Sequence, residues 1–358
     1  MKRFERTRLL RAMAGLAVAS LAMPLMADES SAYIPLGNAD QVAIIDTDSY
    51  QVSGQAQGVV NSHGSDLTPD GRFLVAGSLT PRESGKTPSK PVGVSADEHA
   101  AHHGGGGDTA ASSSTPGTLY LIDTTSKEVV RQFDVPGPVH HVLVTADGRY
   151  AVSTHPMGGG ISVVSLESGE LVASLATGPA PNYMVQNPQN RSLYVSNSGN
   201  GTISEIDTEN WFVRKNMRLE GSPEHMVLDS ERGRLYANDA AEGQAVALDL
   251  ESGDVVAQYP IGSKPHGIDL SADLGTLYVT SQGDNRLVAV SLADGRMRER
   301  ELAPAPYHLA ISPVDGKLLI SSREKPQLWV VDQRTLDTLE TVPLAGVGHQ
   351  IAVGETTN

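Results

Sequence analysis

The amino-acid sequence predicts an all-β protein, a seven-bladed β-propeller with four antiparallel strands in each blade. Three observations support this prediction. One pattern repeats about every 42 residues, each repeat contains four strand-like segments, and the last repeat is divided between the two ends of the chain.

The repeat begins with a Gly- or Pro-containing turn and continues with a short strand. An S-P-D-G-like turn follows, and then a second strand that ends on a small polar residue, as in EHMVLDSERGRLYAND and HGIDLSADLGTLYVTS. The residues that open the second turn are Thr68, Thr145, Asn187, Asp229, Ser271, Ser312 and Gly354. Seven such positions predict seven blades, and an insertion of about 35 residues accounts for the longer first spacing.

The rest of each repeat supplies the two outer strands of a blade. GTISEID and QAVALDL are typical third strands, and GDVVAQYPI is a typical fourth strand. Apolar residues alternate in these segments and D-G or S-G turns join them, which favours strands over helices. Four antiparallel strands per repeat form one propeller blade.

The last copy of the repeat, HQIAVGE, stops after its inner strand near Val353. The N-terminal segments AYIPLGN, QVAIIDT and YQVSGQAQGV match the second, third and fourth strands of a blade. We therefore expect one C-terminal strand and three N-terminal strands to form the seventh blade. This arrangement pairs two sheet edges that would otherwise be exposed.

The N-terminus resembles a secretory signal peptide. A basic segment, residues 1–11, precedes an apolar run, residues 12–26, and Ala27 ends it before a polar stretch. The apolar run is too short to span a membrane. We expect a signal peptide at 1–27 and a propeller at 28–358, exported to the bacterial periplasm or an equivalent space and not inserted in the membrane after cleavage. A buried N-terminal helix is the alternative.

Composition limits the partners of the protein. The formal net charge is −15, which argues against nucleic acid or an anionic membrane as a partner. An acidic protein is suited to meeting cations, although solubility alone also explains the charge. The chain contains no Cys, so it has no disulfides, no thiolate ligands and no C-x-x-C-H haem motif.

The insertion in the first blade covers residues 81–116. It is rich in Gly, Ser, Pro and Ala and almost lacks large apolar residues, so we expect a disordered loop. It carries His99, His102 and His103. Strand direction places this loop over the face where the inner strands start. It is either a metal-capturing loop or a solvated segment of low complexity.

Seven of the eleven His residues occupy the first two positions of the predicted inner strands. They are His63, His140, His141, His225, His266, His308 and His349. Inner strands line the central channel, so their first residues meet at one mouth, in a ring on the order of 10 Å across. Neutral imidazole binds Cu, Zn, Ni and Fe, and the placement predicts a transition-metal site. A His that only caps its strand is the alternative at any single position.

Further groups could assist this site. His155 ends a second strand on the same face, and Glu224 occupies the position equivalent to His63 in another blade. Asp66 and Asp269, on inner strands, are candidate oxygen ligands or partners of the ligating imidazoles.

The repeats LYVSNSGNGTISEIDT and LYVTSQGDNRLVAVSL resemble those of YVTN-type propellers over nearly the whole mature chain. This resemblance implies the fold and says little about function, because many propellers share it.

The His pattern resembles two families. A pair, His140 and His141, with single His residues from other blades is similar to the propeller of nitrous oxide reductase, whose copper cluster is held by seven His. The chain lacks the Cys-containing domain through which that enzyme receives electrons. Channel His residues with a His-bearing loop also resemble the periplasmic zinc metallochaperone propellers that serve ABC importers.

These observations predict a periplasmic metallochaperone or metal store for copper or zinc. A metal transporter or a metalloenzyme acceptor is the expected partner. The alternatives are a copper-dependent oxidoreductase, a lactonase-like hydrolase and a metal-free scaffold for protein binding. No Ser-His-Asp motif or phosphate-binding Gly loop points to catalysis, which favours a protein that is not an enzyme.

Overall fold

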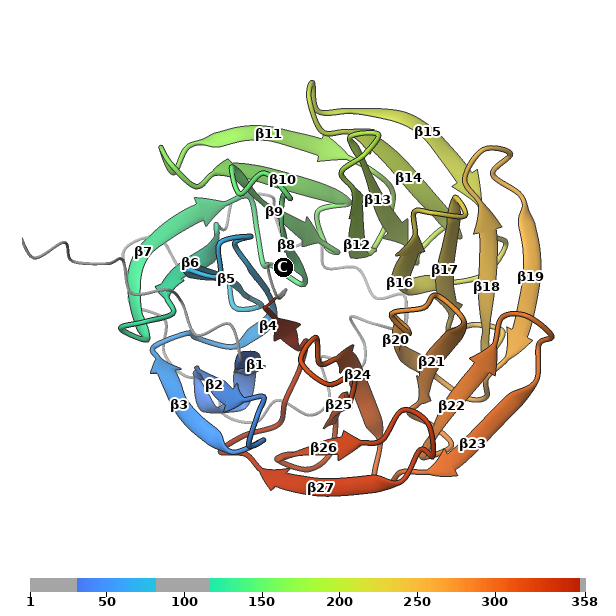
Figure 1. The fold of residues 1–358 in the computed structure, drawn as a ribbon. Helices are drawn as coiled ribbons and strands as arrows, with labels where there is room; N and C mark the ends of the chain where they lie inside the picture. Colours follow the sequence, from blue (N-terminus) through green and yellow to red (C-terminus); the bar gives the residue numbers. More distant parts are fainter. Residues whose placement is uncertain (1–30, 82–115, 355–358) are drawn as a thin grey trace, which may run out of the picture.

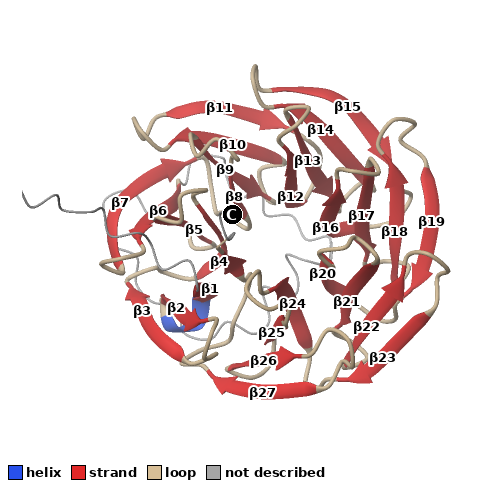
Figure 2. Ribbon diagram, viewed as in Figure 1, coloured by secondary structure: helices blue, strands red, loops and turns tan. Residues whose placement is uncertain are grey.

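The computed structural model describes residues 31–81 and 116–354. In this part of the chain, seven four-stranded antiparallel sheets surround a central channel (Figure 1). Figure 2 shows that these elements are strands except for one short 3-10 helix, η1 (Gly37–Ala39). The predicted seven-bladed propeller is confirmed.

In six blades the strands follow one another along the chain from the channel outward. Blades one to three contain β4 (Ser62–Leu67), β5 (Phe73–Ser78), β6 (Gly117–Asp123), β7 (Glu128–Val135); β8 (Val142–Val144), β9 (Tyr150–His155), β10 (Gly160–Ser165), β11 (Leu171–Ala176); and β12 (Pro181–Asn187), β13 (Ser192–Asn197), β14 (Thr202–Asp207), β15 (Phe212–Arg218). Blades four to six contain β16 (Pro223–Asp229), β17 (Arg234–Asp239), β18 (Gln244–Asp249), β19 (Val255–Pro260); β20 (Pro265–Leu270), β21 (Thr276–Ser281), β22 (Arg286–Ser291), β23 (Met297–Glu301); and β24 (Pro306–Ile311), β25 (Leu318–Ser322), β26 (Gln327–Val331), β27 (Thr338–Pro343).

The seventh blade joins the two ends of the chain, as predicted. Its strand order is β28-β1-β2-β3, with β28 (Ala352–Val353) at the channel and β1 (Ser31–Leu36), β2 (Gln41–Asp46) and β3 (Val52–Gln57) outside it. The closing contact pairs Ala32 with Val353 and Tyr33 with Ala352.

Two segments expected from the sequence lie outside the described residues. They are the signal peptide at 1–27 and the insertion, of which only the ends at Pro81 and Pro116 are described. These ends place the insertion between β5 and β6, the second and third strands of blade one. Among the described residues, no helix is long and apolar enough to cross a membrane.

The apolar core lies between neighbouring blades. Tyr194 of blade three packs with Met226 and Leu235 of blade four, and all three are buried. The outermost strands are more polar and alternate between exposed and partly buried residues, as in β19. Burial on both faces explains the apolar sequences of the second and third strands.

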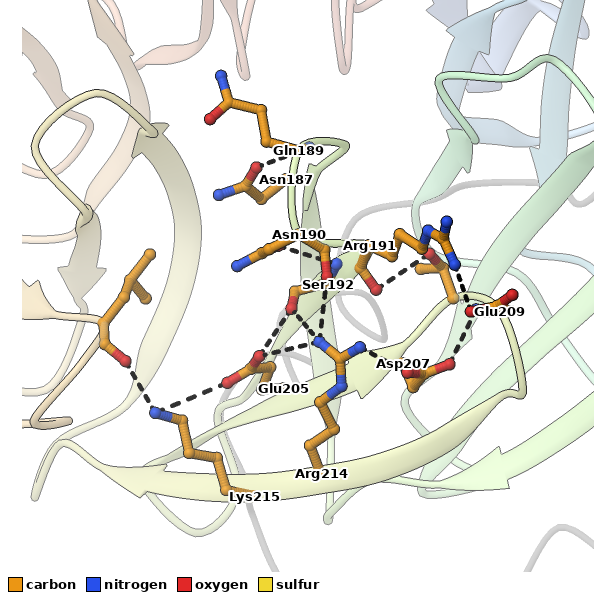
Figure 3. A network of polar contacts seen from close by, with 12 residues as sticks. Asn187, Gln189, Asn190, Arg191, Ser192, Glu205, Asp207, Glu209, Arg214 and Lys215 are labelled. Atoms are coloured by element: carbon orange, nitrogen blue, oxygen red, sulfur yellow. Dashed lines mark hydrogen bonds and ion pairs between the residues drawn. The ribbon is translucent and has the colours of Figure 1, made fainter.

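Polar side chains also join blades. Figure 3 shows a network in which Ser192 donates a hydrogen bond of 2.6 Å to Glu205. Arg214 donates to the Ser192 hydroxyl at 2.7 Å, and the Lys215 ammonium donates to the Leu250 carbonyl of blade four at 2.8 Å. The nearly buried carboxylate of Glu205 is tolerated because these cations and the hydroxyl surround it.

Candidate metal centre

Five of the seven inner strands begin with an irregular pairing that takes two consecutive residues out of the ladder. In β16 the regular register with β17 stops after Pro223 and resumes at Met226, so Glu224 and His225 leave the ladder. The same shift occurs in β4, β12, β20 and β24. In a regular strand two neighbouring residues would point to opposite faces. The bulge removes this constraint, so Glu224 and His225 can both join the same cluster. In β4 and β20 the second position is Gly64 or Gly267, so only the first residue contributes a side chain there.

Hydroxyl groups at the ends of the second strands hold these bulges. The Thr280 hydroxyl accepts a hydrogen bond from the Gly267 amide at 2.8 Å and donates to the Tyr307 carbonyl of the next blade at 2.6 Å. The corresponding pairs of hydrogen bonds are made by Thr154, Ser196 and Ser321. In these four blades, the small polar residue of the sequence repeat therefore links the start of its own inner strand to that of the next blade.

The structure brings all seven predicted His residues into one buried cluster. Their exposed fractions lie between 0% and 6%. The His63 ring centroid lies 4.4 Å from those of His140 and His349 and 5.0 Å from that of His141. On the other side of the channel, the His225 centroid lies 4.7 Å from that of His308.

The imidazole rings of the cluster lie in direct contact with one another. Several blades contribute two side chains, and the rings stack and meet edge to face. His266 also stacks on Tyr307, with centroids 3.8 Å apart and planes at 9°. The seven imidazoles therefore form one buried cluster of rings in mutual contact.

Four groups of side chains in this cluster could hold a metal ion. Within each group, one ligand atom from every residue lies within 4.8 Å of the others. The groups are His63–His140–His141, His63–His308–His349, His141–His225–His308 and Glu224–His225–His266. His63, His141, His225 and His308 each belong to two groups, so the groups interlock.

Burial keeps parts of this cluster uncharged. The pKa values of His63 and His308 fall well below the ordinary value, first because burial disfavours the cation and then because neighbouring imidazoles repel it. Both side chains are therefore neutral at neutral pH, the form that binds metals. Among the described residues, the buried Nε2 of His308 has no hydrogen-bond partner. A metal ion would satisfy this atom.

The tautomer of His141 is set by a backbone group. Its Nδ1 lies 3.0 Å from the Asn182 carbonyl oxygen, which can only accept a hydrogen bond. Nδ1 therefore carries the proton, and Nε2 presents a lone pair 3.2 Å from His225 Nε2. An imidazole that binds a metal through one nitrogen usually donates its other ring N–H to a carboxylate, a backbone carbonyl or a water, which fixes the ring orientation.

Glu224 gives one end of the cluster a different chemistry. Its carboxylate is buried, and Oε2 lies 3.5 Å from Nδ1 of His266. Burial raises the pKa of Glu224 to about 7. With His225 and His266 it forms a group of two imidazoles and one carboxylate.

Other predicted residues are placed elsewhere. His155 lies outside the four groups; its Nδ1 lies 3.0 Å from the Pro138 carbonyl, and its Nε2 lies 2.8 Å from the Ser162 hydroxyl. Asp66 accepts a hydrogen bond from the Val144 amide at 2.8 Å, and Asp269 accepts one from the Ile311 amide at 3.0 Å. Both aspartates thus join neighbouring inner strands.

His99, His102 and His103 lie outside the described residues. The structure therefore does not place them relative to the cluster.

Residues 76–339 match the family model described as outer membrane protein assembly factor BamB. The chain belongs to this family. Membership in this BamB family agrees with the propeller fold. The comparison with curated proteins found no match.

Solved structures share the fold of this BamB-family chain at low sequence identity. The periplasmic gluconolactonase PpgL of Pseudomonas aeruginosa is 18% identical with a TM-score of 0.68, over 90% of this chain and 98% of that one. Hydrazine synthase of Kuenenia stuttgartiensis is 15% identical with a TM-score of 0.67, over 90% and 100%. The dihydro-heme d1 dehydrogenase NirN is 14% identical with a TM-score of 0.62, over 88% of this chain and 64% of that one. This chain thus spans less than two thirds of NirN.

Sequence reasoning missed the contribution of blade three, which has no His in its inner strand. Its Asn182 carbonyl orients His141, and the Tyr183 ring lies 4.9 Å from that of His141 and 4.6 Å from that of His225. Their position in the sequence could have indicated this role, because Asn182 and Tyr183 occupy the same two positions of the repeat as the His residues of the other blades.

Proposed function

We propose that this protein is a metal-binding propeller that stores or delivers copper or zinc in the bacterial periplasm or an equivalent space. One observation carries the proposal: all seven channel His residues belong to four interlocking groups, and within each group the ligand atoms lie within 4.8 Å of one another. Chance placement of His on inner strands would rarely produce this arrangement.

Metal binding explains the burial of so many imidazoles. A buried polar ring is costly unless its nitrogen atoms have partners, and several imidazolium ions at this spacing would repel one another. Apolar side chains would fill a propeller channel at lower cost. A metal ion provides partners for neutral imidazoles and supplies the free energy that offsets their desolvation.

The donor set favours copper or zinc. It consists of imidazole nitrogens and one carboxylate, and no thiolate is available because the chain has no Cys. Imidazole suits Cu, Zn, Ni and Fe, and Cu(II) ranks first among divalent ions in affinity for such donors. Copper is therefore our first candidate and zinc the second. A transporter or a metalloenzyme acceptor would receive the ion.

The first test is metal-dependent stability of the apo protein. A ligand present at 100 times its dissociation constant stabilises the folded state by about 2.7 kcal/mol. We expect the melting temperature to rise by roughly 5–10 °C with Cu(II) or Zn(II) at neutral pH. Elemental analysis of untagged protein from its native source would then identify the metal.

Two double variants provide the matched comparison. His63→Phe with His225→Phe breaks all four groups, while Phe keeps an aromatic ring in each place. His140→Phe with His349→Phe also removes two imidazoles but leaves two groups intact.

We expect the first pair to abolish stabilisation by metal and the second to retain part of it, as measured by calorimetry and thermal melting. Equal behaviour of the two pairs, or a wild-type dissociation constant weaker than about 10 μM, would refute the proposal.

A further inference from the structure

A cavity of about 750 Å³ opens at the end of the channel opposite the strand starts. It is lined by residues of the turns that follow the inner strands, among them Ala146, and by residues within those strands, among them Asp66 and Val185. This volume lies within the range of small-ligand pockets. The insertion joins the other ends of β5 and β6, so the cavity opens on the face away from it.

The deep end of the cavity reaches the histidine cluster. Tyr183 and Gln350 line the cavity. The same Tyr183 ring contacts both His141 and His225, with centroids 4.9 and 4.6 Å apart. Gln350 directly follows His349 in the chain. One layer of side chains therefore separates the cavity from the imidazoles.

This layer is held by weak contacts. Gln350 Nε2 donates to the Tyr183 hydroxyl at 3.4 Å, and Gln350 Oε1 accepts from the Ser65 amide at 3.3 Å. Both distances exceed the usual hydrogen-bond length of about 2.9 Å. Two weakly held side chains, Tyr183 and Gln350, thus separate the cavity from the cluster.

The charges on the wall favour a cation. The charged residues that line the cavity are Asp66 and Asp70, and Lys, Arg and His are absent from its lining. Asp269 lies close by, since it and Asp66 both help burial to raise the pKa of the Tyr183 hydroxyl. A recess lined by one sign of charge concentrates counter-ions and speeds their capture.

We propose that this cavity is the path by which a divalent metal ion reaches the histidine cluster. Asp66 is its transient carboxylate ligand, and the Tyr183–Gln350 pair is the barrier that the ion passes. This inference rests on the proposed metal-binding function. The metal would enter from the face formed by the turns that follow the inner strands, and not from the face where the insertion joins β5 and β6.

Loading kinetics with Co²⁺ test the path, because the visible absorption of Co²⁺ reports coordination directly in a stopped-flow experiment. Ala146→Trp places a large side chain at the cavity wall. Ala272→Trp is the matched control, because Ala272 occupies the same turn position in blade five and is not among the lining residues. Both alanines are exposed, so neither change alters the core.

We expect Ala146→Trp to slow loading at least about tenfold, with Ala272→Trp close to wild type. Asp66→Asn keeps an oxygen that can accept from the Val144 amide, and should slow loading about threefold at low ionic strength and less in high salt. The final Co²⁺ spectrum should be the same in all four proteins.

The two failures can be told apart. If wild-type protein develops no Co²⁺ spectrum at any concentration, the metal-binding function and the path both fail. If wild type loads but Ala146→Trp and Asp66→Asn load at the wild-type rate, only the path is overturned. Slowing by Ala272→Trp equal to that by Ala146→Trp would also overturn it.

Discussion

The charge of Glu224 depends on what is bound beside it. Burial raises its pKa from an ordinary value of 4.5 to about 7, so without a metal it binds a proton near neutral pH. A cation held with His225 and His266 would displace this proton. The carboxyl group thus couples metal binding at this end of the cluster to pH.

Above neutral pH, Glu224→Gln should stabilise the metal-free protein but weaken its stabilisation by metal. A raised pKa gives stability that is complete below pH 4.5 and is lost as pH rises through about 7. Gln is neutral throughout, so metal-free Glu224→Gln should match wild type at pH 4.5 and exceed it at pH 8, by on the order of 3 kcal/mol. Urea denaturation at several pH values measures this difference.

With Zn²⁺ at pH 8, wild type should gain more stability than Glu224→Gln, because the amide is a poorer ligand than the carboxylate. A difference between the two proteins that does not change with pH would contradict the buried, proton-binding state of Glu224.

The sequence identifies residues of the cluster where they occupy equivalent positions in the repeat. The seven His residues of the cluster occupy equivalent positions, and the structure brings them together. His155 has the same chemistry, but its hydrogen bonds depend on the Pro138 carbonyl and the Ser162 hydroxyl, which only the folded chain places beside it. That these His residues bind metal stays a prediction.

At the scale of elements, the hydroxyl-held bulge is the unit that builds the centre. Thr280 is completely buried and connects the amide of Gly267 to the carbonyl of Tyr307 in the next blade. Its hydrogen bonds fix the start of two inner strands at once. His266 and His308, each beside one of these backbone groups, are positioned by the same hydroxyl.

Thr280→Val tests this role with almost no change in shape. The buried amide and carbonyl would lose their partner, and an unsatisfied buried group costs about 1–3 kcal/mol. We expect a loss of about 2 kcal/mol or more in the free energy of unfolding, measured with urea. Thr338→Val, on exposed β27, should change it by less than about 0.5 kcal/mol. Equal effects would show that the Thr280 hydroxyl does not hold the bulge.

The sequence predicted the elements better than their irregularities. Strand number, order and direction follow from alternating apolar residues and the repeated turns, and the structure confirms them. The register shift at Glu224 and His225 arises from pairing with β17, a contact that no local pattern encodes. The contact of Glu224, His225 and His266 in one group depends on this shift.

At the scale of the whole molecule, the segment that closes the propeller also supplies a residue of the centre. The closing strand β28 has two residues, Ala352 and Val353, which pair with β1. The segment before it brings His349 into the cluster and Gln350 to the cavity. Ile351 is buried against blade six and Ala352 against blade one, which fixes this segment.

Truncation after Leu344 therefore removes more than one ligand. The edge of β1 loses the strand that pairs with it, and exposed sheet edges promote aggregation. We expect the truncated chain to aggregate in size-exclusion chromatography and to melt below the wild type. His349→Phe, which removes the imidazole and keeps β28, should remain monomeric with a wild-type elution volume. A truncated chain that elutes as a monomer and melts like wild type would show that six complete blades hold the channel together without the closing strand. The cluster would then depend on the C-terminal segment for a ligand only, and not for its shape.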